Sequence, residues 1–177
     1  MYIKRSITEI LKKRAKNSRC LLLTGPRQVG KSTLLKEIYS DVKYYTFDDK
    51  VLLTSALDDP KLFLKNAAKP SIFDEVQYAK ELFPYIKIEC DKENRYENYY
   101  LTGSQQMKLM DKAKESLAGR VSILELQGLS MREINDISFN KHFVPTEEYI
   151  AAREKEVKPY DNIWQNIHRG AYPELYV

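Results

Sequence analysis

Apolar residues follow two different spacings along most of the chain. Apolar or aromatic runs predict strands at residues 20–24, 43–47, 70–73 and 99–102, and an alternating segment predicts a fifth at residues 121–126. The continuous run at residues 20–24 suits a strand that is buried on both faces. Between and before these runs, apolar residues recur at helical spacing and predict helices at residues 6–16, 31–39, 49–57, 60–67, 81–91 and 108–117. Strands that alternate with helices predict an α/β fold, in which helices cover both faces of a parallel sheet.

The pattern changes beyond about residue 136. A short helix is expected at residues 130–134, while the remaining sequence is largely polar and favours one further helix, at residues 161–169. We therefore expect a core of residues 1–136. Residues 137–177 would form a small helical lid or the start of a further region.

Composition narrows the class of protein. The 177 residues are 43% hydrophobic and carry a formal net charge of +4, which fits a globular domain with its own core. Cys20 and Cys90 lack any pairing or metal-binding spacing, which suits a reducing cytoplasm, and His142 and His168 lie too far apart to indicate a structural metal. No stretch approaches about 18 apolar residues, so no membrane span is expected.

A phosphate-binding motif follows the first expected strand directly. Residues 25–32 have the sequence GPRQVGKS and match the G-x-x-x-x-G-K-[ST] pattern (Walker A) at every fixed position. The glycines let the backbone approach phosphates closely, and successive N–H groups at the start of the next helix form an anion site. We expect Lys31 to reach the β- and γ-phosphates of ATP and the Ser32 hydroxyl to hold Mg²⁺. The predicted nucleotide-binding residues are Gly25, Pro26, Arg27, Gln28, Val29, Gly30, Lys31, Ser32 and Thr33.

Two carboxylates end the third expected strand. Asp74 at this position (Walker B) lies beside the expected magnesium site, and Glu75 can orient or deprotonate the water that attacks the γ-phosphate. A surface turn with two acidic residues would have the same local sequence. The phosphate loop elsewhere in the chain favours the catalytic interpretation.

Other polar residues near strand ends allow two interpretations each. Thr102 or Ser104 can sense the γ-phosphate or position the water, and Ser104 can also cap a helix. Arg120 can stabilise charge on the γ-phosphate, in its own or a neighbouring subunit, or form a surface ion pair. Arg27 can contact the nucleotide or a partner.

Two further charged groups lie outside these motifs. Asp48 and Asp49 follow the second expected strand, where a helix cap is favoured over a role in the site. A cationic cluster near the start of the chain is opposed only by Glu9; it predicts a solvated helix face, or alternatively a weak nucleic-acid contact. Its members are Lys4, Arg5, Lys12, Lys13, Arg14, Lys16 and Arg19.

Five motifs occur together in a fixed order along nearly the whole chain. They are TGPRQVGKS (24–32), FDEVQ (73–77), LTGSQ (101–105), SLAGR (116–120) and RGAYPEL (169–175). In this combination the sequence resembles the prokaryotic AAA-type ATPases of the AAA_14 family, which commonly carry a C-terminal DUF4143 domain. Such proteins usually continue beyond the last motif, so the resemblance implies an N-terminal ATPase portion.

The resemblance has consequences for fold and site. It implies an AAA+-like core with a parallel five-stranded sheet, ATP and Mg²⁺ as ligands, and a cytoplasmic location. It also strengthens Arg120 as a candidate. The residues that it marks as nucleotide machinery are Lys31, Ser32, Asp74, Glu75 and Ser104.

These observations predict an ATPase that converts ATP to ADP and phosphate. The alternative is a nucleotide-dependent switch with little turnover, linked to DNA or to a protein partner, which includes self-association through the core. A small-molecule kinase is disfavoured because no motif indicates a second substrate. A GTPase is disfavoured because residues 140–143, NKHF, lack the aspartate that would pair with guanine.

Overall fold

A computed structural model describes residues 2–93, 96–104, 111, 113, 115–139, 141–156 and 163–176. Several sequence positions with expectations attached lie outside this range: Gln105, Asn140, residues 161–162 and part of the helix expected at residues 108–117. The chain divides into two compact units, Ile7–Gln127 and a second unit formed by Met1–Ser6 with Gly128–Val177. The boundary expected at residue 136 stays a prediction.

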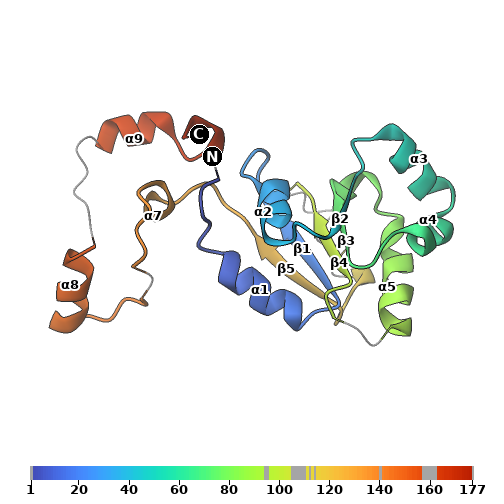
Figure 1. Cartoon of the computed structure of the whole chain (residues 1–177), viewed down its shortest axis with the longest axis horizontal. Helices are drawn as coiled ribbons and strands as arrows, with labels where there is room; N and C mark the ends of the chain where they lie inside the picture. Colours follow the sequence, from blue (N-terminus) through green and yellow to red (C-terminus); the bar gives the residue numbers. More distant parts are fainter. Residues whose placement is uncertain are drawn as a thin grey trace. The chain divides into compact units, whose positions relative to one another are not determined.

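A parallel sheet forms the centre of the larger unit (Figure 1). Within the described residues it has five strands in the order β2-β3-β4-β1-β5, all paired in parallel, which confirms the predicted α/β fold. The strands are β1 (Cys20–Thr24), β2 (Lys43–Thr46), β3 (Ser71–Asp74), β4 (Tyr99–Thr102) and β5 (Val121–Glu125). Strand β4 therefore lies between β1 and β3, and the carboxyl ends of these three strands meet at one edge of the sheet.

The helices of this unit begin and end within two residues of their predicted bounds. They are α1 (Thr8–Lys16), α2 (Lys31–Ile38), α3 (Lys50–Asp58), α4 (Pro60–Asn66) and α5 (Leu82–Lys92), with a short 3-10 helix at Val76–Tyr78. Polar side chains set two of the starts: Asp49 accepts from the backbone N–H of Val51 and Leu52 before α3, and Asp59 accepts from Leu62 before α4. The expectation that Asp49 caps a helix is thus confirmed.

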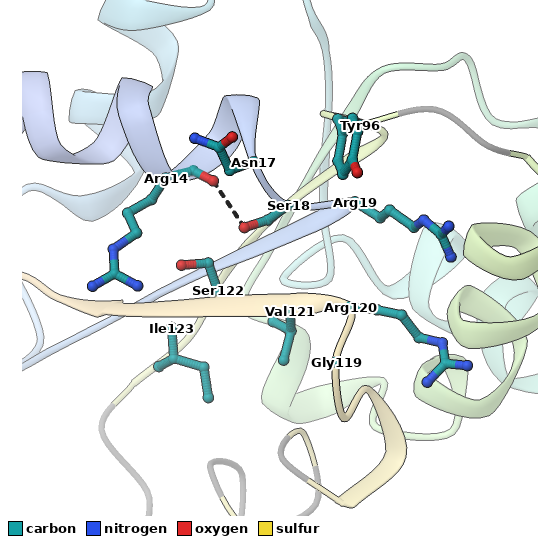
Figure 2. A pocket seen from close by; sticks show the side chains of 10 residues that line it. All are labelled: Arg14, Asn17, Ser18, Arg19, Tyr96, Gly119, Arg120, Val121, Ser122 and Ile123. Carbon is teal, nitrogen blue, oxygen red and sulfur yellow. Dashed lines mark hydrogen bonds between the residues drawn. The ribbon is translucent and has the colours of Figure 1, made fainter.

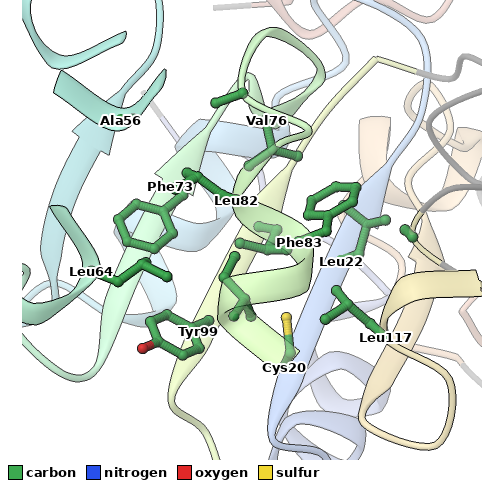
Figure 3. Packing of buried hydrophobic residues seen from close by; sticks show 14 of the residues in the cluster. Cys20, Leu22, Ala56, Leu64, Phe73, Val76, Leu82, Phe83, Tyr99 and Leu117 are labelled. Carbon is green, nitrogen blue, oxygen red and sulfur yellow. The ribbon is translucent and has the colours of Figure 1, made fainter. Parts of the chain in front are cut away.

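Two hydrophobic layers cover the two faces of the sheet. On one face, Phe83 and Ile86 of α5 pack with Leu22 and Phe73 in a buried cluster that also holds Cys20 and Tyr99 (Figure 3). On the other face, α1 contacts β1 and β5, and α2 contacts β4. Because strand side chains alternate between faces, the fully buried runs of β1, β3 and β4 supply both layers.

The second unit contains three further helices among its described residues: α7 (Met131–Ile134), α8 (Glu147–Glu154) and α9 (Ile163–Arg169). The sequence pattern did not predict α8. Its apolar residues, at positions 149–152, are consecutive and form no stripe at helical spacing. The start of the helix depends on Thr146, whose Oγ1 accepts from the N–H of Tyr149 at 3.2 Å. No described helix of the chain is both long enough and apolar enough to cross a membrane.

Candidate nucleotide-binding site

The predicted phosphate loop connects β1 to α2 at the carboxyl edge of the sheet. Gly25 has φ of 144°, and a Cβ there would lie 2.1 Å from the carbonyl oxygen of Leu126, so only glycine fits where the loop leaves the sheet. Gly30 has φ of 92° in the left-handed region, directly before the first residue of α2. The two glycines thus fix the turn that places the start of α2 at the loop, where helix N–H groups attract anions.

Lys31 lies at the centre of this loop. Its side chain is buried, and Nζ donates to the carbonyl oxygens of Gly25 at 3.1 Å and Pro26 at 2.7 Å. Burial lowers the pKa of Lys31 below its ordinary value, although the nearby carboxylates of Glu75 and Asp74 oppose that shift. A phosphate oxygen would give the ammonium group a charged acceptor in place of a neutral carbonyl.

Asp74 receives hydrogen bonds from three different elements. The Ser32 hydroxyl of α2 donates to Oδ1 at 2.7 Å, and the Thr102 hydroxyl of β4 donates to the same oxygen. The Tyr44 hydroxyl of β2 donates to Oδ2. Strand order explains the convergence: β4 and β2 flank β3, so Thr102 and Tyr44 reach Asp74 from either side.

A second chain of polar contacts starts at Glu75. This residue has φ of 58°, and its N–H donates to the Thr102 hydroxyl at 3.3 Å. Its carboxylate accepts a hydrogen bond from Nε2 of Gln77, and Oε1 of Gln77 accepts from the N–H of Ser104 at 3.3 Å. The Ser104 hydroxyl is buried and has no hydrogen-bond partner within the described part of the chain. Gln77 therefore joins the two residues, Glu75 and Ser104, that the sequence assigned to catalysis.

The remaining predicted loop residues differ in exposure. Val29 is buried, so its side chain belongs to the core and only its backbone can face a phosphate. Arg27, Gln28 and Thr33 are exposed, and Pro26 is half-buried. The positive charge of Arg27 contributes to the lowered pKa of Lys31, which places its guanidinium near the same anion site.

Arg120 lies at the other edge of the sheet. It precedes β5, and its carbonyl accepts from the N–H of Cys20 at the start of β1. The phosphate loop begins at Gly25, five residue steps beyond Cys20 in the direction of β1, about 16 Å away at about 3.3 Å per residue. The guanidinium pairs instead with Asp91 of α5, through Nε at 2.6 Å and a second nitrogen at 2.9 Å. Arg120 therefore does not reach the phosphate loop of its own chain, and a role in a neighbouring subunit's site stays a prediction.

Sequence reasoning missed two residues of this arrangement. Tyr44 was assigned only to an aromatic strand, and Gln77 appeared only as a letter of a motif. Neither could be found without the strand order, which brings β2 beside β3 and the turn after β3 beside Ser104. The Thr102 hydroxyl donates to Asp74 and accepts from the N–H of Glu75, and the expectation that Thr102 or Ser104 senses the γ-phosphate or positions the water stays a prediction.

The donor set fits a nucleotide with Mg²⁺. The Ser32 hydroxyl and the Asp74 carboxylate are hard oxygen ligands held next to each other, which suits Mg²⁺. The loop whose turn depends on glycines, the N–H groups at the start of α2 and the ammonium group of Lys31 can together bind the phosphates. A strand–loop–helix unit of this kind, with a carboxylate on a nearby parallel strand, defines a P-loop nucleotide-binding domain.

Comparison with known proteins gives the family. The sequence profile of AAA_14, described as an AAA domain, matches residues 17–135, and the chain belongs to this family of ATPase-type, nucleotide-binding domains. Uncharacterized protein Rv2008c of Mycobacterium tuberculosis and its counterpart Mb2031c of Mycobacterium bovis are each 36% identical over 115 residues. The matched segment spans 64% of this chain and 26% of those relatives.

Solved structures agree on the fold. AMPPCP-bound DnaA from Aquifex aeolicus superposes with a TM-score of 0.57 at 12% identity, over 99% of this chain and 61% of DnaA. A katanin chain, from a structure on katanin self-assembly, gives a TM-score of 0.51 at 14% identity, over 88% and 63% of the two chains. The AAA+-like α/β core expected from the sequence is therefore confirmed.

Proposed function

We propose that this domain binds ATP with Mg²⁺ at the phosphate loop and hydrolyses it to ADP and phosphate. The observation that carries the proposal is the 2.7 Å hydrogen bond between Ser32 and Asp74, which joins the loop to the acidic end of β3. These are the two protein oxygens that would hold the ion. When bound, Mg²⁺ neutralises negative charge on the β- and γ-phosphates.

Residues of the chain bind the phosphates, orient the carboxylate and accept the proton. Lys31 and the N–H groups at the start of α2 bind the phosphates, and Thr102 with Tyr44 orients Asp74. Glu75 is the group that accepts the proton of the attacking water, as a bond forms from water oxygen to the γ-phosphorus and the bond to the β-phosphate oxygen breaks. Gln77 hydrogen-bonds to both the Glu75 carboxylate and the backbone N–H of Ser104, and so keeps these two residues close together.

Three variants test this assignment. Lys31→Ala should abolish measurable ATP binding in calorimetry. Glu75→Gln should keep ATP binding but lower phosphate release by a factor of about 10² to 10⁴, the range of general-base contributions. The matched control is Glu37→Gln on the exposed side of α2, which should change neither quantity. Unchanged turnover in Glu75→Gln would make the catalytic assignment wrong.

One observation favours a second candidate, a nucleotide-dependent switch with little turnover of its own. Arg120 is held by Asp91 at the edge of the sheet opposite to the loop, so it supplies no positive charge to the γ-phosphate in its own chain. ATP binding without phosphate release at any protein concentration would support the switch. Release that rises more steeply than the protein concentration would support hydrolysis completed by a second subunit.

A further inference from the structure

A cleft lined by arginines lies at the amino edge of the sheet, away from the phosphate loop (Figure 2). Its volume is about 600 Å³. One wall is formed by Arg14 of α1 and by Ser18, which follows this helix. The other is formed by Arg120, which precedes β5, and by Ser122 of that strand. We call this feature the arginine cleft; Arg19 and Tyr96 complete it.

Positive charge exceeds negative charge in this cleft. Among the described residues, Asp91 is the carboxylate that pairs with its arginines, at 3.4 Å from Arg19 and 2.6 Å from Arg120. The side chain of Arg14 is exposed and makes no hydrogen bond or ion pair with another described residue. Arg19 and Arg120 thus share Asp91, while Arg14 keeps a guanidinium group that can attract anions to the cleft.

The last turn of α1 extends the positive surface beyond the cleft. Lys13 and Lys16 are exposed in the same turn as Arg14. In the described part of this helix the one acidic side chain, Glu9, lies a turn or more earlier and approaches Lys12 at 3.8 Å. The positive surface therefore runs from the cleft along the end of α1. Its extent suits a ligand with several negative charges along its length better than it suits a single anion.

Tyr96 adds a different kind of contact. Its side chain is 54% exposed and lines the cleft beside the arginines. Exposed aromatic rings next to cationic grooves bind unpaired bases by stacking, which is open to a single strand but not to bases inside a duplex. Guanidinium groups bind phosphodiester oxygens at the same time.

We propose that the arginine cleft binds the sugar–phosphate backbone of a single-stranded nucleic acid, with one base stacked on Tyr96. Arg14 and Arg19 contact the phosphates, and the lysines of the α1 end hold the strand as it leaves the cleft. This site is separate from the phosphate loop, and its occupation requires no ATP hydrolysis.

The test is fluorescence anisotropy with labelled oligothymidylate and oligouridylate of about 15 nucleotides, within the range of single-strand site sizes. The double variant Arg14→Ala/Arg19→Ala should weaken binding at least tenfold at low salt. A plot of the logarithm of the binding constant against the logarithm of the salt concentration should also become shallower. Its slope should change by about 1.4, because each lost phosphate contact removes about 0.7. Lys50→Ala/Lys61→Ala removes the same charge from exposed positions on α3 and α4, and should leave affinity within about twofold of the unchanged chain.

Three further variants separate a binding site from a folding effect. Asp91→Asn removes the carboxylate that competes for Arg19 and Arg120, so binding should tighten. Tyr96→Ala should weaken binding about tenfold, while Tyr96→Phe, which keeps the ring, should bind like the unchanged chain. A variant that merely disturbs the fold would not produce the gain expected for Asp91→Asn.

Four outcomes would overturn the proposal. The first is the absence of binding to either oligonucleotide at low salt. The second is an equal loss in the Lys50/Lys61 control, which would indicate diffuse attraction. The third is loss of binding in Lys31→Ala, which would place the strand in the phosphate loop. The fourth is a change in sedimentation of the Arg14/Arg19 variant without a change in oligonucleotide binding, which would make the cleft a protein–protein surface.

Discussion

At the scale of single residues, Asp74 is the centre of the candidate site. Its two oxygens accept hydrogen bonds from Ser32, Thr102 and Tyr44, so the carboxylate is fixed by α2, β4 and β2 together. Tyr44 pairs with Ile72 in the sheet, two residues before Asp74, and its side chain therefore lies on the same face. The ammonium group of Lys36 lies 3.6 Å from the centre of the Tyr44 ring and covers its exposed side.

The contact with Tyr44 leads to a prediction about magnesium. Burial, followed by the hydrogen bond and charge of Asp74, raises the pKa of Tyr44, so the phenol stays protonated and keeps donating. In Tyr44→Phe, Oδ2 of Asp74 loses its hydrogen-bond donor. Half-saturation of ATP binding should then need about tenfold more Mg²⁺, which is the lower end of the effects seen when a residue that hydrogen-bonds to a metal ligand is replaced. Titration of Mg²⁺ with a fluorescent ATP analogue measures this.

Tyr45→Phe provides the matched control. It also removes a phenol hydroxyl from β2, but that hydroxyl accepts from the N–H of Ala68, away from Asp74. The magnesium requirement should stay at the value of the unchanged chain. Equal shifts in the two variants would show that the effect comes from the strand as a whole and not from the bond to Asp74.

At the scale of elements, short polar caps decide where helices begin. Asp49 follows β2 and accepts from Val51 at 2.8 Å and Leu52 at 3.3 Å, which ends the connection and starts α3. Asp48, its neighbour, is exposed, and its carboxylate makes no hydrogen bond or ion pair with another described residue. The sequence contains two adjacent aspartates, but the backbone conformation (φ −73°, ψ 111° at Asp49) selects the second as the cap.

Asp49→Ala should therefore lower the free energy of unfolding by about 1 kcal/mol, the usual loss for an N-cap. Asp48→Ala should stay within about 0.5 kcal/mol of the unchanged chain. Urea denaturation of both variants measures the difference. If Asp49→Ala instead lowered ATP affinity at unchanged stability, Asp49 would belong to the nucleotide site rather than to the helix.

At the scale of the whole molecule, both ends of the described chain belong to one compact unit, and Glu133 connects them. Its carboxylate accepts from the backbone N–H of Ser6 and of Ser130, both at 2.7 Å, and from Arg5 at 3.2 Å. Both side chains of the Arg5–Glu133 pair are buried. The same carboxylate closes a capping box with Ser130 at the start of α7.

This arrangement predicts how the unit responds to acid. Burial alone would raise the pKa of Glu133, but the N–H groups of Ser130 and Ser6, with Arg5, outweigh it and lower the pKa below its ordinary value of 4.5. A group with a lowered pKa stabilises the fold above the unfolded value, and this contribution is lost as pH falls through the folded value. Acid should therefore loosen the unit below about pH 4.5.

Glu133→Gln tests the prediction. At pH 7 it should destabilise the unit by about 2 kcal/mol, because the bonds lose their charged acceptor. The difference from the unchanged chain should shrink below pH 4.5, where the natural carboxyl group becomes neutral as well. Amide hydrogen exchange of segments 2–6 and 128–137 measures this, with Glu148→Gln on the exposed α8 as control. A difference that stays constant down to pH 3 would contradict the role of the charge.

The sequence by itself determined the local features of this protein. Apolar or aromatic runs predicted four strands, the alternating segment at residues 121–126 predicted the fifth, and helical spacing predicted the helices that cover them. The phosphate loop was predictable because its glycines, needed for the backbone turn, and Lys31 and Ser32, needed for their ammonium and hydroxyl groups, lie within one short segment. Asp74 and Glu75 were predictable from their place at a strand end. Helix α8 was not, because its apolar residues are consecutive and show no helical spacing.

Only the tertiary structure decided which distant residues meet. The strand order put β4 between β1 and β3 and β2 at the edge, and this order brings Thr102 and Tyr44 to Asp74. It also separates Arg120 from the phosphate loop of its own chain and pairs it with Asp91, although the family resemblance had favoured a role for Arg120 at the nucleotide. Strand order depends on how the two faces of the sheet pack against the helices. This packing is the sum of many weak contacts, so no single position in the sequence predicts it.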